Sequence, residues 1–73
     1  MTTQEVKTEV TGSVWKLLVA VGDQVNEGDE VAIMESMKME IPVLSPAGGT
    51  IKEITAKEGE VRNEGEAVAI LEI

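Results

Sequence analysis

Few side chains of this 73-residue chain could do chemistry, because the residue types that most often act as bases, nucleophiles or metal ligands are missing. The chain contains no His, Cys, Tyr or Phe and a single Trp. Without imidazole or thiol groups, it can build neither a Ser-His or Cys-His nucleophile nor a zinc site with nitrogen or sulfur ligands. Lysines, hydroxyls and 14 carboxylates remain. We therefore predict no catalytic residue and no metal site.

One lysine stands out because of the residues on either side of it. The segment Met34–Val43 is typical of two strands joined by a tight turn centred on Met37 and Lys38, with Met39 next in sequence. Two-residue hairpin turns need positive φ angles and favour Asn-Gly, Asp-Gly or Gly-Gly. Met and Lys do not favour that conformation, and such departures tend to occur at functional sites. A lone lysine at a hairpin tip is nevertheless more often a solvated charge. Whether Lys38 has a special role therefore depends on the elements that position it.

Two carboxylates flank the same tip and could in principle form an acid–base pair. They are Glu35 and Glu40. Strand residues five apart face opposite sides of a strand, so we expect two solvated charges instead.

The composition favours strands as the elements that position the hairpin. Val, Ile and Thr supply 22 of the 73 residues, and these stiff β-branched side chains suit a pleated sheet. Short apolar stretches are separated by Gly, Asn, Asp and Pro, which is typical of a small all-β sandwich or barrel. The expected strands are Glu5–Val10, Ser13–Val19, Glu30–Ser36, Met39–Leu44, Thr50–Thr55 and Ala67–Glu72, with short extended pieces near Gln24–Val25 and Val61–Arg62.

The chain also repeats itself at an offset of 37 residues. Gly12–Glu35 aligns with Gly49–Glu72 without a gap, and nine of the 24 positions are identical. A unit that is used twice must pack against its copy to bury its apolar face. We therefore predict one domain over residues 1–73, a sandwich with approximate two-fold symmetry. The offset maps the hairpin around Lys38 onto the two chain ends, so Lys38 should project at the pole opposite the termini.

The two copies carry further local predictions. Repeated glycines such as Gly28 and Gly65 fall in turns, where we expect positive φ. Val25 of the first copy corresponds to Arg62 of the second. We expect the Arg62 stem to cover apolar surface while its charged head lies in water.

The charge balance excludes several classes of partner. The net charge of −8 repels phosphate backbones and anionic membranes, and one aromatic residue makes no stacking platform. The longest apolar run, Leu17–Val21, is too short to span a membrane, and the first residues lack the features of a signal peptide. We expect a cytoplasmic monomer that binds neither nucleic acid nor membrane.

At the hairpin the chain resembles a known family. The segment Glu35–Glu40 reads ESMKME, and together with Gly22–Ala32 before it and Ser45–Ile51 after it this pattern resembles the biotinyl domain of biotin-dependent carboxylases. The resemblance covers about Lys7 to Ile73 and is especially clear for the small free-standing biotin/lipoyl attachment proteins. It implies a flattened barrel of two antiparallel four-stranded sheets.

The resemblance also implies a function. Biotin would be joined by an amide bond to the ε-amine of Lys38 by a biotin protein ligase, and the modified chain would shuttle carboxylate between biotin carboxylase and carboxyltransferase sites. Met37 and Met39 match the flanking methionines that assist recognition in that family. The ungapped repeat implies a version without the protruding insertion of some bacterial carriers. Ser36 stands where Ala is commoner, and we expect little effect from that difference.

Two alternatives stay open. Lipoyl domains share this fold but typically show Asp-Lys-Ala at the hairpin, so Met37-Lys38-Met39 favours biotin over lipoate; attachment of both groups is a further alternative. The other reading is an unmodified sandwich that serves as an adaptor, a role that would not require Met-Lys-Met at the tip.

Overall fold

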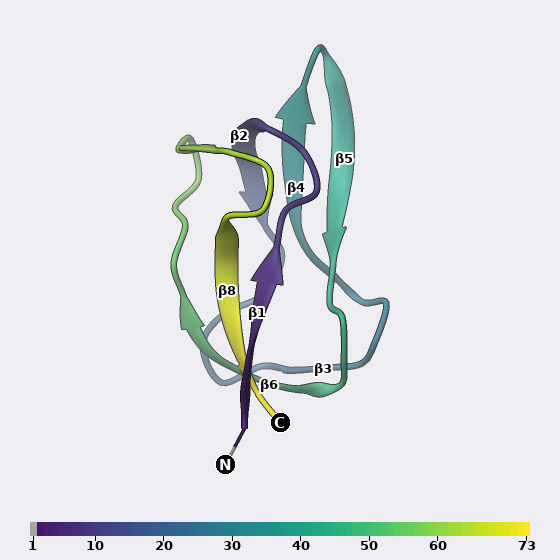
Figure 1. Cartoon of the computed structure of the whole chain (residues 1–73), viewed down its shortest axis with the longest axis vertical. Helices are drawn as coiled ribbons and strands as arrows, with labels where there is room; N and C mark the ends of the chain where they lie inside the picture. The colour runs from purple at the N-terminus through teal and green to yellow at the C-terminus, as the bar shows by residue number, and fades with distance from the viewer. Residues whose placement is uncertain (1) are drawn as a thin grey trace.

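The computed structural model describes residues 2–73. They contain eight β-strands, joined by turns and loops, and no helix. The strands form two four-stranded sheets with the orders β1-β8-β6-β3 and β5-β4-β2-β7, and all strand pairs are antiparallel (Figure 1). This confirms the predicted barrel-sandwich architecture. No helix in these residues is long and apolar enough to cross a membrane. The strands are β1 (Thr3–Lys7), β2 (Gly12–Leu17), β3 (Gln24–Val25), β4 (Glu30–Ser36), β5 (Met39–Leu44), β6 (Gly49–Ile54), β7 (Val61–Arg62) and β8 (Ala67–Glu72).

Three predicted strands, Glu30–Ser36, Met39–Leu44 and Ala67–Glu72, have the observed bounds. The predicted strand Thr50–Thr55 is displaced by one residue from β6, and the predicted strand Ser13–Val19 begins one residue after β2 begins and runs two residues past its end. The first strand differs most. β1 begins at Thr3 and ends at Lys7, so the predicted range Glu5–Val10 was wrong at both ends. The Thr8 hydroxyl donates to the carbonyl of Val10 at 2.9 Å and accepts from its amide at 3.2 Å. This local side-chain contact competes with the sheet ladder and turns the chain away from it.

The two halves repeat each other in detail, as the sequence offset predicts. β2 has a register shift between Val14 and Lys16, and β6 has the equivalent shift between Ile51 and Glu53. Loops of equal length follow these two strands, so no insertion breaks the symmetry there. Each half also donates a backbone hydrogen bond to the other. The amide of Val14 donates to the Glu60 carbonyl at 2.7 Å, and the amide of Ile51 donates to the Asp23 carbonyl at 2.8 Å. Neither half is therefore complete without its copy.

Small and medium aliphatic side chains fill the space between the sheets, and the single Trp is not among them. The turns that lead into the core strands use glycine as predicted: Gly28 and Gly65 have φ angles of 89° and 87°. An aliphatic core suits the stiff β-branched residues that dominate the composition. The buried apolar residues are Val6, Val14, Val25, Val31, Ala32, Met34, Val43, Ile51, Ala56, Val68, Ala69 and Leu71.

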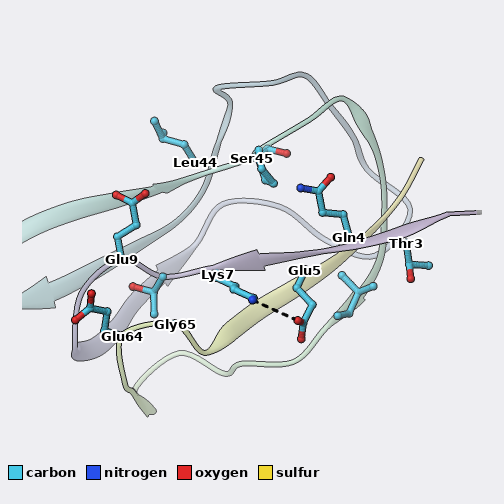
Figure 2. Close-up of a pocket in the computed structure, with 12 residues that line it drawn as sticks. Thr3, Gln4, Glu5, Lys7, Glu9, Leu44, Ser45, Glu64 and Gly65 are labelled. Atoms are coloured by element: carbon cyan, nitrogen blue, oxygen red, sulfur yellow. Dashed lines mark ion pairs between the residues drawn. The ribbon is translucent and has the colours of Figure 1, made fainter.

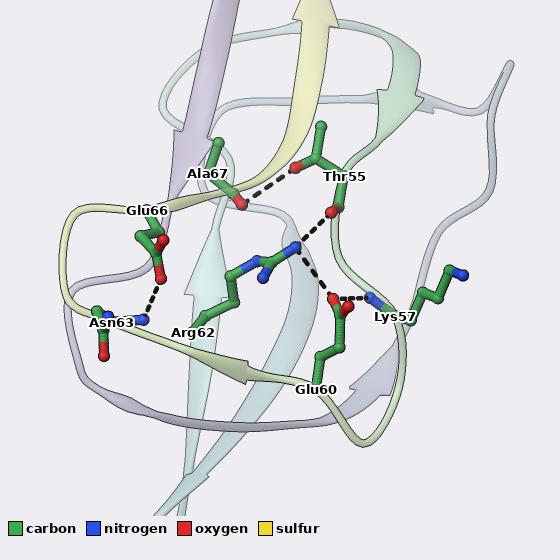
Figure 3. A network of polar contacts seen from close by, with 7 residues as sticks. All are labelled: Thr55, Lys57, Glu60, Arg62, Asn63, Glu66 and Ala67. Carbon is green, nitrogen blue, oxygen red and sulfur yellow. Dashed lines mark hydrogen bonds and ion pairs between the residues drawn. The ribbon is translucent and has the colours of Figure 1, made fainter.

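Arg62 differs from its prediction. Its guanidinium is not left in water: Nη2 donates to the Thr55 carbonyl at 2.5 Å and lies 3.0 Å from Oε1 of Glu60 (Figure 3). The same Glu60 oxygen accepts from the Lys57 amide, and the Thr55 hydroxyl donates to the Ala67 carbonyl. Arg62 thus links β7 to the loop after β6. The expectation of a solvated head was wrong because the Thr55 carbonyl lies within reach of the Arg62 guanidinium. Tertiary packing brings the two groups together.

Candidate functional site

The β4–β5 hairpin forms one end of an elongated molecule whose extents are 37 × 18 × 18 Å. Figure 1 shows this hairpin at the top and both chain ends at the bottom. The placement agrees with the prediction that Lys38 lies at the pole opposite the termini.

The turn at the tip has the conformation that its residues disfavour. Ser36 pairs with Met39, which leaves Met37 and Lys38 as a two-residue turn with φ angles of 51° and 64°. They are the only non-glycine residues between positions 2 and 73 with positive φ. A left-handed conformation costs an L-residue about 1–2 kcal/mol, so a side chain at each position is retained at the expense of stability.

The side chains at the tip point into solvent rather than into the fold. Met37 is 89% exposed, Met39 is 58% exposed, and Lys38 is also exposed. Large apolar side chains normally gain stability by burial, and these two gain little of it. Packing within this domain therefore does not explain the two methionines.

The projecting turn is held where it leaves the sheet by the residues that enter β2. We call this level, where Ser36 pairs with Met39 directly below the turn, the hairpin base. The Ser36 hydroxyl donates to the Thr11 carbonyl at 2.9 Å, and the Thr11 hydroxyl accepts from the Glu64 amide at 2.9 Å. A Cβ on Gly12 would collide with the carbonyl oxygen of Glu35. These contacts fix where the hairpin leaves the sheet.

Sequence reasoning missed the roles of both Ser36 and Gly12. The expectation that Ser36 has little effect overlooked its bond to Thr11, which joins residues 25 apart in sequence and leaves no local signal. Gly12 did carry a signal, because it is identical to Gly49 in the repeat, where a Cβ would lie 2.6 Å from the Glu72 carbonyl oxygen. In both copies glycine permits a close approach of backbone to backbone.

The two glutamates beside the tip lie on the same face of the hairpin, so the sequence argument about them was wrong. Glu35 and Glu40 are direct partners in the β4–β5 register, and both are exposed. Residues five apart in one strand face opposite sides, but here a two-residue turn separates the two and brings them opposite each other. The tip therefore carries a pair of negative charges on one side.

A broad hollow of the surface lies away from Lys38. It runs between the edge strands β1 and β5, and Figure 2 shows Leu44 and Ser45 on one wall with Glu5 and Lys7 on the other. Lys7 Nζ lies 3.9 Å from Glu5 Oε1 within it. No residue of the Lys38 turn lines this hollow. An exposed amine that lies outside this hollow is suited to entering the active site of another protein.

The comparisons with known proteins agree with this geometry. A family model described as "Biotin-requiring enzyme", the biotin/lipoyl family, matches residues 2–71. The chain is 48% identical over 63 residues to a biotin/lipoyl attachment protein of Bacillus subtilis, with 86% of each chain covered. It is 37% identical to a biotinylated protein TB7.3 homolog of Mycobacterium leprae, covering 93% of this chain and 96% of that one.

Similar domains also occur within much longer enzymes. The chain is 39% identical to a segment of Bacillus subtilis pyruvate carboxylase, which covers 92% of this chain but 6% of the enzyme. Among solved structures, the urea carboxylase of Kluyveromyces lactis superposes with a TM-score of 0.91 at 36% identity, covering 99% of this chain and 6% of that one. The same fold thus occurs both as a short protein and as a small part of multidomain carboxylases.

Proposed function

Because the chain belongs to the biotin-requiring family of biotin/lipoyl attachment domains, we propose that Lys38 is the residue on which this carrier holds its biotin. The observation that carries the proposal is the turn itself. Lys38 is an exposed lysine at the end of the molecule, in a left-handed conformation that a glycine would adopt at lower cost. A residue kept there against its preference is needed for its side chain.

The other lysines have different surroundings. Lys7 faces Glu5, the Nζ of Lys16 lies 5.4 Å from the centroid of the Trp15 ring, and Lys52 lies within strand β6. Lys57 lies in a loop anchored to Glu60 through its amide. None of the four stands on the projecting turn. We propose that the attachment is specific to Lys38 for this reason.

The ε-amine of Lys38 fits the chemistry of acylation. In its neutral form the amine attacks the activated carboxyl carbon of biotinyl-adenylate, a carbon–nitrogen bond forms, the bond from that carbon to the phosphate oxygen breaks, and adenylate leaves. The proton lost from nitrogen passes to a base of the ligase, since the tip offers no imidazole. When attached, biotin supplies the site at which carboxylate is carried.

The chain's own residues then present and release the carrier arm. The two-residue turn holds the arm clear of both sheets, and the hydrogen bond from Ser36 to Thr11 keeps the hairpin base in place. Met37 and Met39 offer adaptable apolar surface to the enzymes that receive the tip. Residues 1–73 form one carrier domain, and the chain itself is non-catalytic.

The partners follow from this role. They are a biotin protein ligase, a biotin carboxylase component and a carboxyltransferase component, all acting in the cytoplasm. Contacts with the last two should be transient, because a shuttling arm must leave each site. The net charge of −8 favours electropositive partner surfaces.

The experiment that tests the proposal compares two acyl groups on the same lysine. The chain is co-expressed with a biotin protein ligase or with a lipoyl ligase, and intact masses are measured for the wild type and for Lys38→Arg. We expect one biotin on the wild type and none on Lys38→Arg, with Lys52→Arg labelled like the wild type as the matched control. An unmodified wild type, or a label that survives Lys38→Arg, contradicts the proposal. Lipoate on Lys38 without biotin would reassign the carrier to acyl transfer.

A further inference from the structure

The two outer faces of the sandwich can be compared position by position, because both sheets are built from the same repeat. On the sheet β5-β4-β2-β7, which carries the hairpin, Trp15 is 45% exposed and Val61 is 64% exposed. The offset of 37 places Lys52 and Gln24 at the equivalent positions of the other sheet. The fold does not require apolar residues at these two positions, since the equivalent positions of the other sheet are polar.

The apolar side chains continue across the hairpin sheet. Ile33 pairs with Pro42 on one side and with Lys16 on the other, and it points outward because its neighbour Met34 is fully buried. The equivalent of the exposed Pro42 in the second sheet is Glu5. We call Trp15, Ile33, Pro42 and Val61 the apolar face. Three of these four positions are polar in the other sheet.

Acidic groups border the apolar face on two sides. Glu35 and Glu40 lie toward the hairpin tip. The Glu58 carboxylate accepts from the Leu17 amide at 3.0 Å, which places it beside β2. The Glu60 carboxylate is paired with Arg62 and is not counted in this rim. Lys16 lies inside this patch, because it pairs with Ile33 and its Nζ lies 5.4 Å from the centroid of the Trp15 ring. A largely apolar patch with a charged rim is the composition of a protein docking surface, and the acidic rim selects a partner with basic residues around an apolar patch.

The apolar face begins within the footprint of a protein that grips the tip from this side of the sandwich. Val61 pairs with Ser13, which pairs with Glu35, three residues before Lys38. At about 3.3 Å per strand residue, this level is about 10 Å below the tip. An interface of standard size buries about 800 Å² per partner, equivalent to a disc of about 16 Å radius. A partner centred on Lys38 that leans toward this sheet therefore covers Val61. It reaches Ile33 at the edge of the disc, because Ile33 lies five residues before Lys38, about 16 Å along the strand.

We infer that the apolar face is the docking surface for the ligase that acylates Lys38, an inference that rests on the proposed function. The ligase acts on the bare amine, which reaches no further than its four-carbon stem. It must therefore bring its own surface against the hairpin and the adjoining sheet. An enzyme that acts on the attached cofactor works at the end of a longer arm and can stay further from the sheet. Trp15 is the expected anchor, because aromatic residues dominate binding energy at interfaces.

The test measures ligation kinetics on the full chain with a purified biotin protein ligase, ATP and biotin. The variant Trp15→Gln/Val61→Gln makes the face polar without changing the net charge. Lys52→Arg and Gln24→Ser, which also leave the net charge unchanged, are matched controls on the other sheet. We expect the double variant to raise KM for the chain about tenfold with little change in kcat, and the controls to leave both constants unchanged. Circular dichroism and the thermal midpoint establish that each variant is folded.

The remaining outcomes separate the two proposals. A double variant with the KM of the wild type, or controls that raise KM as much, overturns the docking inference while leaving attachment at Lys38 intact. A wild-type chain that takes no biotin at Lys38 overturns the proposed function, and the docking inference with it. For the charged rim, we expect KM of the wild type to rise with NaCl concentration; a KM independent of salt contradicts the assignment of a basic partner surface.

Discussion

Glu35 and Glu40 lie directly opposite each other across the β4–β5 hairpin, one residue pair below the turn that holds Lys38. Two carboxylates that face each other across strands repel, whereas the equivalent pair at the other pole, Thr3 with Glu72, has one charge. The like-charge pair is therefore a property of the hairpin that carries Lys38 and not of the repeat. It lowers stability at the place where the chain presents its lysine.

Replacing one member of this pair should stabilise the domain. We expect Glu40→Thr, which copies the pair at the other pole, to raise the free energy of unfolding by about 0.2–1 kcal/mol, measured by urea denaturation at low salt. The mirror change Thr3→Glu should lower it by a similar amount. Because the effect is electrostatic, added salt should reduce both changes; a gain that is independent of salt would contradict this cause.

The turn itself should tolerate a more stable sequence. We expect Met37→Asn combined with Lys38→Gly to raise the free energy of unfolding by about 1 kcal/mol, since Asn-Gly suits two positive φ angles. Urea or thermal denaturation measures the gain, and the variant carries no acyl group at position 38. As a control, an Asn-Gly pair at Thr3-Gln4, within strand β1, should destabilise. A loss of stability from the turn variant would show that the native turn is not strained.

The two methionines should matter to enzymes and not to folding. Met37→Ala and Met39→Ala remove side chains that are mostly exposed, so we expect the free energy of unfolding to change by less than about 0.5 kcal/mol. Ligation or carboxylation kinetics should change in at least one of the two. Met34→Ala, at a fully buried position, is the contrast and should cost about 2–5 kcal/mol. If Met37→Ala or Met39→Ala lowers the free energy of unfolding as much as Met34→Ala does, the exposed methionines serve packing.

The repeated glycines offer a matched pair that separates stability from function. A Cβ at Gly12 collides with the Glu35 carbonyl, and one at Gly49 collides with that of Glu72. We expect Gly12→Ala and Gly49→Ala each to destabilise by about 1–3 kcal/mol. Only Gly12→Ala should also slow acylation of Lys38 in chains that remain folded, because Gly12 lies at the hairpin base. If Gly12→Ala and Gly49→Ala slow acylation equally, the hairpin base does not position Lys38.

Arg62 can be tested against its own counterpart. Arg62→Ala removes the bond to the Thr55 carbonyl and the ion pair with Glu60. We expect a loss of about 1–2 kcal/mol in the free energy of unfolding. Arg62→Val installs the residue of the first copy, Val25, which is buried, and should recover part of the loss through apolar burial. If Arg62→Ala is neutral in thermal denaturation, the network does not hold the loop.

Much of the fold follows from local sequence. The β-branched composition, the turn residues and the ungapped repeat were enough to predict an all-β sandwich, the three strands Glu30–Ser36, Met39–Leu44 and Ala67–Glu72, and the projecting position of Lys38. These are short-range signals: alternation within a strand, punctuation between strands, and an offset that is read directly from the residues. The strain at Met37 and Lys38 was also predictable, because φ preferences are properties of individual residues.

What only the tertiary structure decided are the contacts between residues far apart in the chain. The bond from Ser36 to Thr11, the clash that keeps Gly12 a glycine and the carbonyl that captures Arg62 all depend on where another strand or loop lies. Strand register is likewise a tertiary property, since a turn of two residues, not five positions along one strand, sets Glu35 against Glu40. The sequence alone determined which side chain is presented; the packing of two half-domains determined how firmly it is held and which sheet face stands beside it.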